Sequence, residues 1–160
     1  MKTLLTQETV FVEKDVLKGF HQFDKEADVQ INRMIYYPYY FFEFKVHAKS
    51  LLKFNGKVGC TIDALGGRGA IVDVQPEFFE SQVEHLAVPS IVIVQEEASK
   101  KAEEFVFEHT STKAKFITTP TIKQISSQLF YRPFWIAEYR RNEEEQQLIV
   151  DAVSGSYHPL

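Results

Sequence analysis

The chain has 160 residues, of which 44% are hydrophobic and 14% aromatic, and its formal net charge is −4. This composition provides enough apolar side chains for a folded core and excludes a disordered chain. Residues 1–94 carry 10 Lys and Arg against 12 Asp and Glu, and residues 95–160 carry 8 against 10. Neither half has the basic surface typical of proteins that bind nucleic acids or anionic membranes, so we expect neither partner.

The N-terminal segment and the single cysteine bear on location. Glu8 follows soon after Lys2, which leaves no room for the apolar core of a secretory signal. No apolar run is long enough to span a bilayer as a helix. Cys60 has no second cysteine with which to form an intramolecular disulfide, which fits a reducing compartment. We therefore expect a cytoplasmic protein, although removal of a signal from the native gene product would leave the same sequence.

In the first half, apolar residues at three- and four-residue spacings predict an amphipathic helix over residues 9–29. A dense aromatic and β-branched run then predicts a strand from Tyr39 to Val46. Asn55-Gly56 lies between the apolar runs 51–54 and 57–62, and predicts the turn of a hairpin because both residues tolerate positive φ. Gly66-Gly67-Arg68-Gly69 predicts a further turn into a strand over residues 70–74.

In the second half, a stripe of alanine and aromatic residues predicts a helix over residues 96–107, with acidic residues in its first turn. A strand from Phe134 to Arg141 is expected to pair across the polar loop 142–146 with a strand over residues 147–153. Residues 74–94 and 110–129 carry no clear pattern.

The sequence repeats itself. Residues 36–45 (YYPYYFFEFK) return as residues 131–140 (YRPFWIAEYR), and the ending 62–67 returns as 150–155. An internal duplication indicates two related units, and units of this size would be marginal unless they shared a core. We therefore predict an α+β fold with two related repeats, residues 1–94 and 95–160. Each would be a helix followed by an antiparallel β-meander, and the two would pack pseudo-symmetrically.

The second repeat resembles a known group of small modules. The helix over residues 96–107, the strand over residues 135–139 and the ending 150–155 are similar to PepSY modules and the wider cystatin-like group, and residues 36–67 are a second copy of the pattern. The resemblance implies a tandem accessory module that binds or restrains another protein rather than an enzyme. PepSY modules usually lie outside the cytoplasmic membrane, and the lack of a signal here departs from that.

The duplicated aromatic strand is the main candidate for a ligand site. Its proposed ligand-binding residues are Tyr36, Tyr40, Glu43, Tyr131, Trp135 and Glu138. Both faces of the strand begin with apolar residues, so the alternative is a buried core seam. Pro38 and Pro133 cannot donate a ladder hydrogen bond, which places each at a strand start or a sheet edge. Such an edge could accept an extended peptide by strand addition.

The duplicated carboxylates have two interpretations each. Glu43 and Glu138 could form ion pairs with Lys45 and Arg140 on the same strand face, or could act together as an acid and a base. Asp63 and Asp151 each precede a glycine by four residues, which favours turn capping over hydrolytic or metal chemistry.

Other chemical sites are not expected. The five histidines are separated by 26, 38, 24 and 49 residues, none of which is a short metal-ligand spacing. The glycine-rich segment 66–69 connects two predicted strands and so lacks the helix N-terminus of a phosphate-binding loop. Cys60 lies in a predicted strand, where a buried structural thiol is favoured over a nucleophile. We expect no metal and no cofactor.

The leading hypothesis is a non-enzymatic binding or regulatory protein that takes a peptide, a protein edge or a small apolar ligand. The alternative is a small hydrolase or isomerase with Glu43, Glu138, Asp63 or Asp151 as acid and base between the repeats. A third interpretation is an obligate homo-oligomer, because surplus aromatic residues and open edges also describe an interface.

Overall fold

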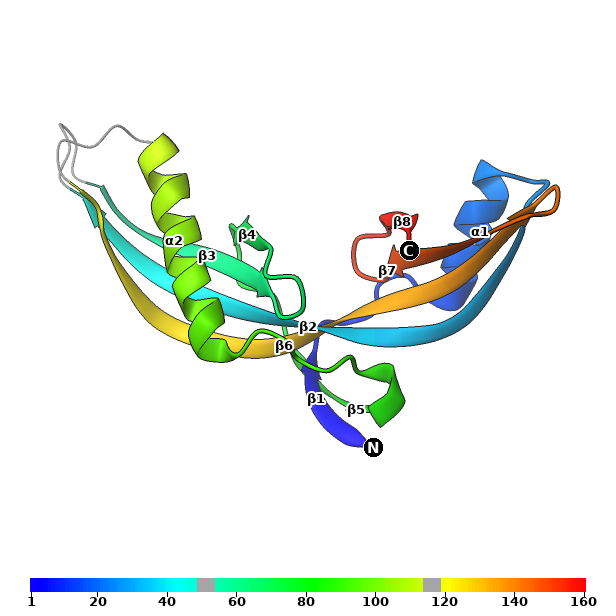
Figure 1. Ribbon diagram of the computed structural model, residues 1–160, viewed down its shortest axis with the longest axis horizontal. Coiled ribbons are helices and arrows are strands. Elements are labelled where there is room, and N and C mark those ends of the chain that lie inside the picture. The colour runs from blue at the N-terminus through cyan, green and yellow to red at the C-terminus, as the bar shows by residue number, and fades with distance from the viewer. Residues whose placement is uncertain (49–53, 114–118) are drawn as a thin grey trace. The chain divides into compact units, whose positions relative to one another are not determined.

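The computed structural model describes residues 1–48, 54–113 and 119–160, of which 51% lie in strands and 22% in helices. The elements, labelled in Figure 1, are β1 (Lys2–Thr6), α1 (Glu13–Phe23), β2 (Asp28–Ala48), β3 (Phe54–Asp63), β4 (Gly69–Val72), β5 (Phe79–Val83), η1 (His85–Ala87), α2 (Gln95–Lys113), β6 (Thr121–Arg141), β7 (Glu144–Asp151) and β8 (Tyr157–Pro159).

The described strands form one mixed sheet in the order β4-β3-β2-β6-β1-β5, with β7 paired to β6 and β8 paired to β7. The pairs β2–β3, β3–β4, β6–β7 and β7–β8 are antiparallel. β1 pairs with β5 antiparallel and touches β6 in the parallel sense at Thr6 and Tyr131. Sequence analysis had not predicted β1, β5 or β8.

The chain divides into two compact units. Unit 1 consists of residues 1–37, 77–89 and 131–160, and unit 2 of residues 38–76 and 90–130. Each unit takes segments from residues 1–94 and from residues 95–160, so the compact units and the sequence halves are different divisions of the chain. β2 and β6 have 21 residues each and contribute to both units.

The prediction of two repeats, each a helix followed by a meander and packed pseudo-symmetrically, is wrong. α1 belongs to unit 1 with β7 and β8, whereas β3 and β4, which follow α1 along the chain, belong to unit 2 with α2. The reason lies in the length of β2 and β6. A strand of 21 residues extends for about 70 Å, far more than one small helix-and-sheet unit needs, so it carries the chain out of one unit and into the other.

The core of unit 2 lies between α2 and the strands β2 and β3, which run alongside the helix in Figure 1. Ala98, Ala102 and Val106 are completely buried, and their small size lets the helix approach the sheet closely. The opposing strand residues are Phe42, Phe44, Val46, Cys60 and Ile62. Phe41, on the other face of β2, is 2% exposed, which confirms that both faces of the aromatic strand are covered.

The core of unit 1 lies between α1 and the strands β6 and β7. Val16 and Phe20 of the helix pack against Ala137, Leu148 and Val150. The helix covers less of the chain than predicted, because it ends at Phe23 and strand β2 begins at Asp28. The signal that was missed is the alternation of polar and apolar residues over 28–32 (DVQIN), which has the period of a strand.

Two hairpin predictions had different outcomes. Asn55 and Gly56 are not a turn, because they lie within β3 opposite His47 and Val46. Residues 51–53 of the predicted hairpin lie outside the described residues. The hairpin of β6 and β7 is confirmed with a shorter loop, in which Asn142 and Glu143 both have positive φ as a two-residue type I′ turn requires.

The sequence placed Pro38 and Pro133 at a strand start or a sheet edge. Neither proline starts a strand, because both lie inside β2 and β6, where they are almost completely buried. The pairing of β2 with β3 begins at Tyr39, and that of β6 with β7 begins at Phe134. The missing proline N–H therefore falls just outside the β2–β3 and β6–β7 ladders, which helps the long strands to tolerate the prolines.

Candidate functional site

Asp63 and Asp151 occupy matching turns, and their predicted capping role is confirmed. Oδ1 of Asp63 accepts hydrogen bonds from the N–H groups of residues 65 and 66 at 2.8 and 3.0 Å. Oδ1 of Asp151 accepts from those of residues 153 and 154 at 2.9 and 3.2 Å. The glycine four positions later, Gly67 or Gly155, has φ near +80° and donates to the aspartate carbonyl at 2.8 Å in both turns. These carboxylates hold a turn.

The same turns anchor the segments that lead into the helices. In unit 2 the carbonyl of Ala64 accepts hydrogen bonds from the N–H groups of Val92 and Ile93, and in unit 1 the carbonyl of Ala152 accepts from those of residues 10 and 11. Tyr40 donates its hydroxyl to the carbonyl of Ile93 at 2.9 Å, and Trp135 donates Nε1–H to the carbonyl of Phe11 at 2.8 Å. Two of the six proposed ligand-binding residues therefore bind the protein's own backbone.

Tyr36 and Tyr131 both lie in unit 1. Tyr131 is 6% exposed, and its carbonyl accepts a hydrogen bond from the N–H of Gln7. Tyr36 is half-buried, which raises the pKa of its hydroxyl, and it lines a hollow of about 280 Å³ with Thr6 and Ser81. Thr6 is buried, and its hydroxyl and that of Ser81 share a hydrogen bond of 2.7 Å.

Glu43 and Glu138 belong to different units, Glu43 to unit 2 and Glu138 to unit 1. Glu43 lies 3.9 Å from Nζ of Lys57 on β3 rather than pairing with Lys45. Glu138 lies 3.6 Å from Arg140, as predicted. Each carboxylate thus has its own local cation, and both pairs are partly exposed, so each contributes little to stability.

Arg132 and Asp151 form an ion pair that the sequence analysis missed. Nη2 of Arg132 lies 2.8 Å from the carboxylate, and Nε donates to both carboxylate oxygens at 3.1 and 2.9 Å. Burial raises the pKa of Asp151, but the hydrogen bonds and charge of Arg132, together with the turn N–H groups, outweigh it and hold that pKa below 3.8. The sequence carried one sign of this pair: Arg132 stands where the first copy of the repeated segment has the aromatic residue Tyr37.

Cys60 is completely buried, and burial raises the pKa of its thiol to about 11, which confirms the prediction of a structural thiol. Among residues 1–48, 54–113 and 119–160, no group of three or more His, Cys, Asp or Glu side chains is placed to hold a metal ion. None of the helices in the described part of the chain is both long and apolar enough to cross a membrane.

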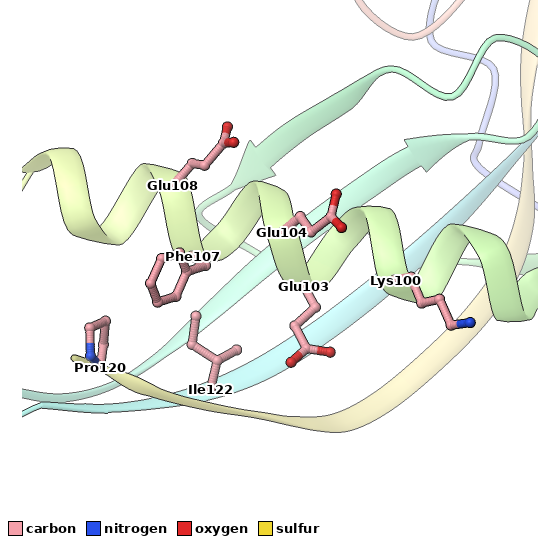
Figure 2. Close-up of a pocket in the computed structure, with 7 residues that line it drawn as sticks. All are labelled: Lys100, Glu103, Glu104, Phe107, Glu108, Pro120 and Ile122. Carbon is pink, nitrogen blue, oxygen red and sulfur yellow. The ribbon is translucent and has the colours of Figure 1, made fainter.

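A hollow in unit 2 lies between α2 and the start of β6 (Figure 2). The first turns of α2 are joined directly to the strand, because Gln95 donates to Ser127 at 3.0 Å and Ser99 to Gln124 at 2.5 Å. Beyond these bonds the space between helix and strand opens into a groove of about 550 Å³. Its walls are Lys100, Glu103, Glu104, Phe107, Glu108, Pro120 and Ile122.

The groove has an apolar floor, and one of the three glutamates that line it faces the strand (Figure 2). In Figure 2 the ring of Phe107 and the side chain of Ile122 point into the space between helix and strand, with Pro120 beside them. The carboxylate of Glu103 extends toward the strand, whereas those of Glu104 and Glu108 lie on the far side of the helix. Phe107 is 39% exposed, so its ring is available to a partner. Sequence analysis had placed Phe107 on the helix but had assigned no role to residues 110–129.

The groove borders an open stretch of sheet edge. β7 pairs with β6 only from Phe134 onward, and β1 touches β6 only at Tyr131. Among the described strands, β2 is therefore the only neighbour of the segment from Thr121 to Gln128. This segment exposes one side of its backbone beside an apolar groove, the arrangement that strand addition requires.

Comparison of the chain with protein-family models, with curated proteins and with solved structures gives no match. The resemblance to PepSY and cystatin-like modules therefore stays a prediction.

Proposed function

We propose that this chain is a non-enzymatic binding or accessory protein that takes an extended peptide, or the edge of another protein, at the start of β6 in unit 2. The observation that carries the proposal is the open edge of residues 121–128 beside the groove of Phe107, Pro120 and Ile122. A cytoplasmic location is part of the proposal and rests on the single unpaired Cys60.

The bound segment would use two kinds of contact. Its backbone would pair with the exposed N–H and C=O groups of β6, as in other cases of strand addition. Alternate side chains would point toward α2, where an apolar one would pack on Phe107 and Ile122. A neighbouring basic side chain would face Glu103, whose carboxylate extends from α2 toward the strand (Figure 2).

The experiment uses a blocked peptide of alternating valine and lysine and follows the backbone amides of the full chain by NMR. Binding should shift the amide signals of residues 121–128 and slow their hydrogen exchange. The same peptide with N-methylated amides along one side, which cannot pair with a strand, should bind at least about tenfold more weakly because several backbone hydrogen bonds of about 1 kcal/mol would be lost.

A matched pair of variants tests the groove. Phe107→Ala should weaken peptide binding about tenfold, the effect of losing part of a buried aromatic contact. Phe79→Ala removes a similarly exposed ring, 46% against 39%, from unit 1 and should leave binding unchanged. Equal effects of both variants, or shifts outside β6 and α2, would reject this site. Self-association of the chain through the same edge would show as concentration-dependent shifts without peptide and would support a homo-oligomer instead.

A further inference from the structure

The two helices enter their units in the same way, which allows their residues to be matched. The N–H groups of Ile93 and Phe11 make equivalent hydrogen bonds to an alanine carbonyl, and the first helical bonds join Ala98 to Val94 and Val16 to Val12. Position for position, Lys101 of α2 therefore corresponds to Gly19 of α1, and Phe105 corresponds to Phe23.

In unit 2, the side chains of α2 fill the space above the glycine turn. A Cβ atom placed on Gly67 would lie 3.5 Å from Cε and 3.7 Å from Cδ of Lys101. A Cβ atom on Gly69 would lie 2.9 Å from the ring of Phe105. The aliphatic stem of a lysine thus lies against the turn, beside an aromatic ring.

In unit 1, the matching helix position is Gly19, which has no side chain to fill the space above the turn at Gly155. A Cβ atom on Gly19 would have no neighbour within 4 Å, and a pocket of about 220 Å³ opens between α1 and the turn at Gly155. Its walls are Phe11, Asp15, Val16, Gly19, Phe20, Phe23, Val150, Gly155 and Tyr157. An apolar cavity of about 150 Å³ is enough to bind benzene, so this pocket has room for a small aromatic or branched molecule.

The walls of the pocket are suited to a cation with an apolar body. The rings of Phe20 and Tyr157 meet edge to face, with centroids 5.0 Å apart and planes at 64°, and two further phenylalanine rings line the walls. Asp15 stands at the rim, where one carboxylate oxygen accepts a hydrogen bond from the N–H of Val12 at 3.2 Å. No lysine or arginine occurs among the described residues that line the pocket. Aromatic faces and a carboxylate both attract an ammonium group.

We infer that the unit 1 pocket binds a small ammonium compound with an apolar body, which takes the place that the side chain of Lys101 occupies in unit 2. This pocket shares no lining residue with the groove of unit 2, and its test does not depend on the proposal of peptide binding.

The test measures binding of 2-phenylethylammonium chloride to the full chain by calorimetry, with the neutral 2-phenylethanol as its isostere. The ammonium compound should bind at least about fivefold more tightly than the alcohol, the preference expected from cation–π and charge attraction at a partly exposed site. Binding of the ammonium compound should also shift the NMR signal of the indole N–H of Trp135, because this N–H donates to the carbonyl of Phe11 in the pocket wall.

Three variants test whether the ligand occupies the space above Gly19 and whether Asp15 attracts its charge. Gly19→Lys would place the protein's own lysine in the pocket and should abolish binding, while lysine suits a helix better than glycine and the fold should persist. Gly19→Ala, whose Cβ has space, should retain binding within about threefold, since it adds a single methyl group. Asp15→Asn should weaken binding of the ammonium compound but not of the alcohol.

Equal affinity for the two compounds, or undiminished binding to Gly19→Lys, would overturn the inference. So would failure of wild-type protein to bind the ammonium compound at millimolar concentration.

Discussion

The ion pair between Asp151 and Arg132 offers the sharpest test of how unit 1 is held together. The change is Asp151→Ala, which removes the partner of Arg132 and the acceptor of the two turn N–H groups at once. The side chains are 13% and 26% exposed, so neither group is fully hydrated in the folded protein. Among the described residues, Arg132 would keep its 3.3 Å hydrogen bond to Gln7.

The expected loss of stability follows from these contacts. Removing one partner of an exposed ion pair costs at most about 1 kcal/mol of stability, whereas removing one partner of a buried pair costs about 3–5 kcal/mol. The pair of Asp151 and Arg132 is intermediate in burial, so we assign it a loss of roughly 2 kcal/mol. The two turn N–H groups add about 1 kcal/mol together, because that of Ser154 lies in an exposed turn and can bind water instead. Asp151→Ala should therefore lower the free energy of unfolding by roughly 3 kcal/mol at pH 7.

The effect should depend on pH in a fixed direction. The pKa of Asp151 is held below its ordinary value of 3.8 in the folded protein. Its contribution to stability is thus fully present well above pH 3.8 and is lost as the pH falls through the lower pKa of the folded state. The difference between wild type and Asp151→Ala should be largest at pH 7 and clearly smaller at pH 3.

Urea unfolding followed by the fluorescence of Trp135 measures this difference, because the single tryptophan lies in the same unit as Asp151. Arg132→Met and the double variant complete a thermodynamic cycle that isolates the pairing energy. A loss below about 1 kcal/mol, or a loss of equal size at both pH values, would refute the assignment of a half-buried, charge-dependent pair.

Three further predictions concern unit 2. Tyr40→Phe removes a buried hydroxyl that donates to the carbonyl of Ile93, and should lower the free energy of unfolding by about 1–2 kcal/mol; no change in the urea midpoint would contradict this bond. Gly67→Ala forces a Cβ at φ +78° and to within 2.8 Å of Cδ1 of Ile93, so thermal unfolding should show a loss of about 2 kcal/mol, and a neutral effect would argue against the turn. Cys60, with a pKa of about 11, should resist thiol-disulfide reagents at pH 8 until urea unfolds the protein; rapid labelling of native protein would show that the thiol is accessible.

Local features of this protein could be predicted because they depend on residues close together in the chain. The aspartate and the glycine four positions later specify the turns at Asp63 and Asp151, since a short carboxylate caps a turn and glycine accepts positive φ. The alanine stripe over residues 98–106 likewise predicted the helix α2, and the polar loop after Arg141 predicted the hairpin of β6 and β7. The burial of Cys60 followed from its position in an apolar strand.

The candidate sites were harder to predict than the elements. Tyr40 and Trp135 occupy the same position in the two copies of the aromatic segment, and each donates a hydrogen bond to the backbone of the segment before a helix. These contacts join residues that are 53 and 124 positions apart, so no local sequence pattern reveals them. The groove that we propose to bind a peptide depends on residues 120–122, which lie in a stretch without clear periodicity. The unit 1 pocket depends on a single glycine in a helix, which by sequence alone only weakens the helix.

By itself, the sequence determined the turns at Asp63 and Asp151, the presence of the two helices and the central part of the two aromatic strands. Only the tertiary structure decided which helix covers which strands, because β2 and β6 continue past Pro38 and Pro133 and carry the chain from one compact unit to the other. Local sequence sets the preference for extended backbone at each residue, but the packing of distant residues selects how far a strand continues and which helix it meets.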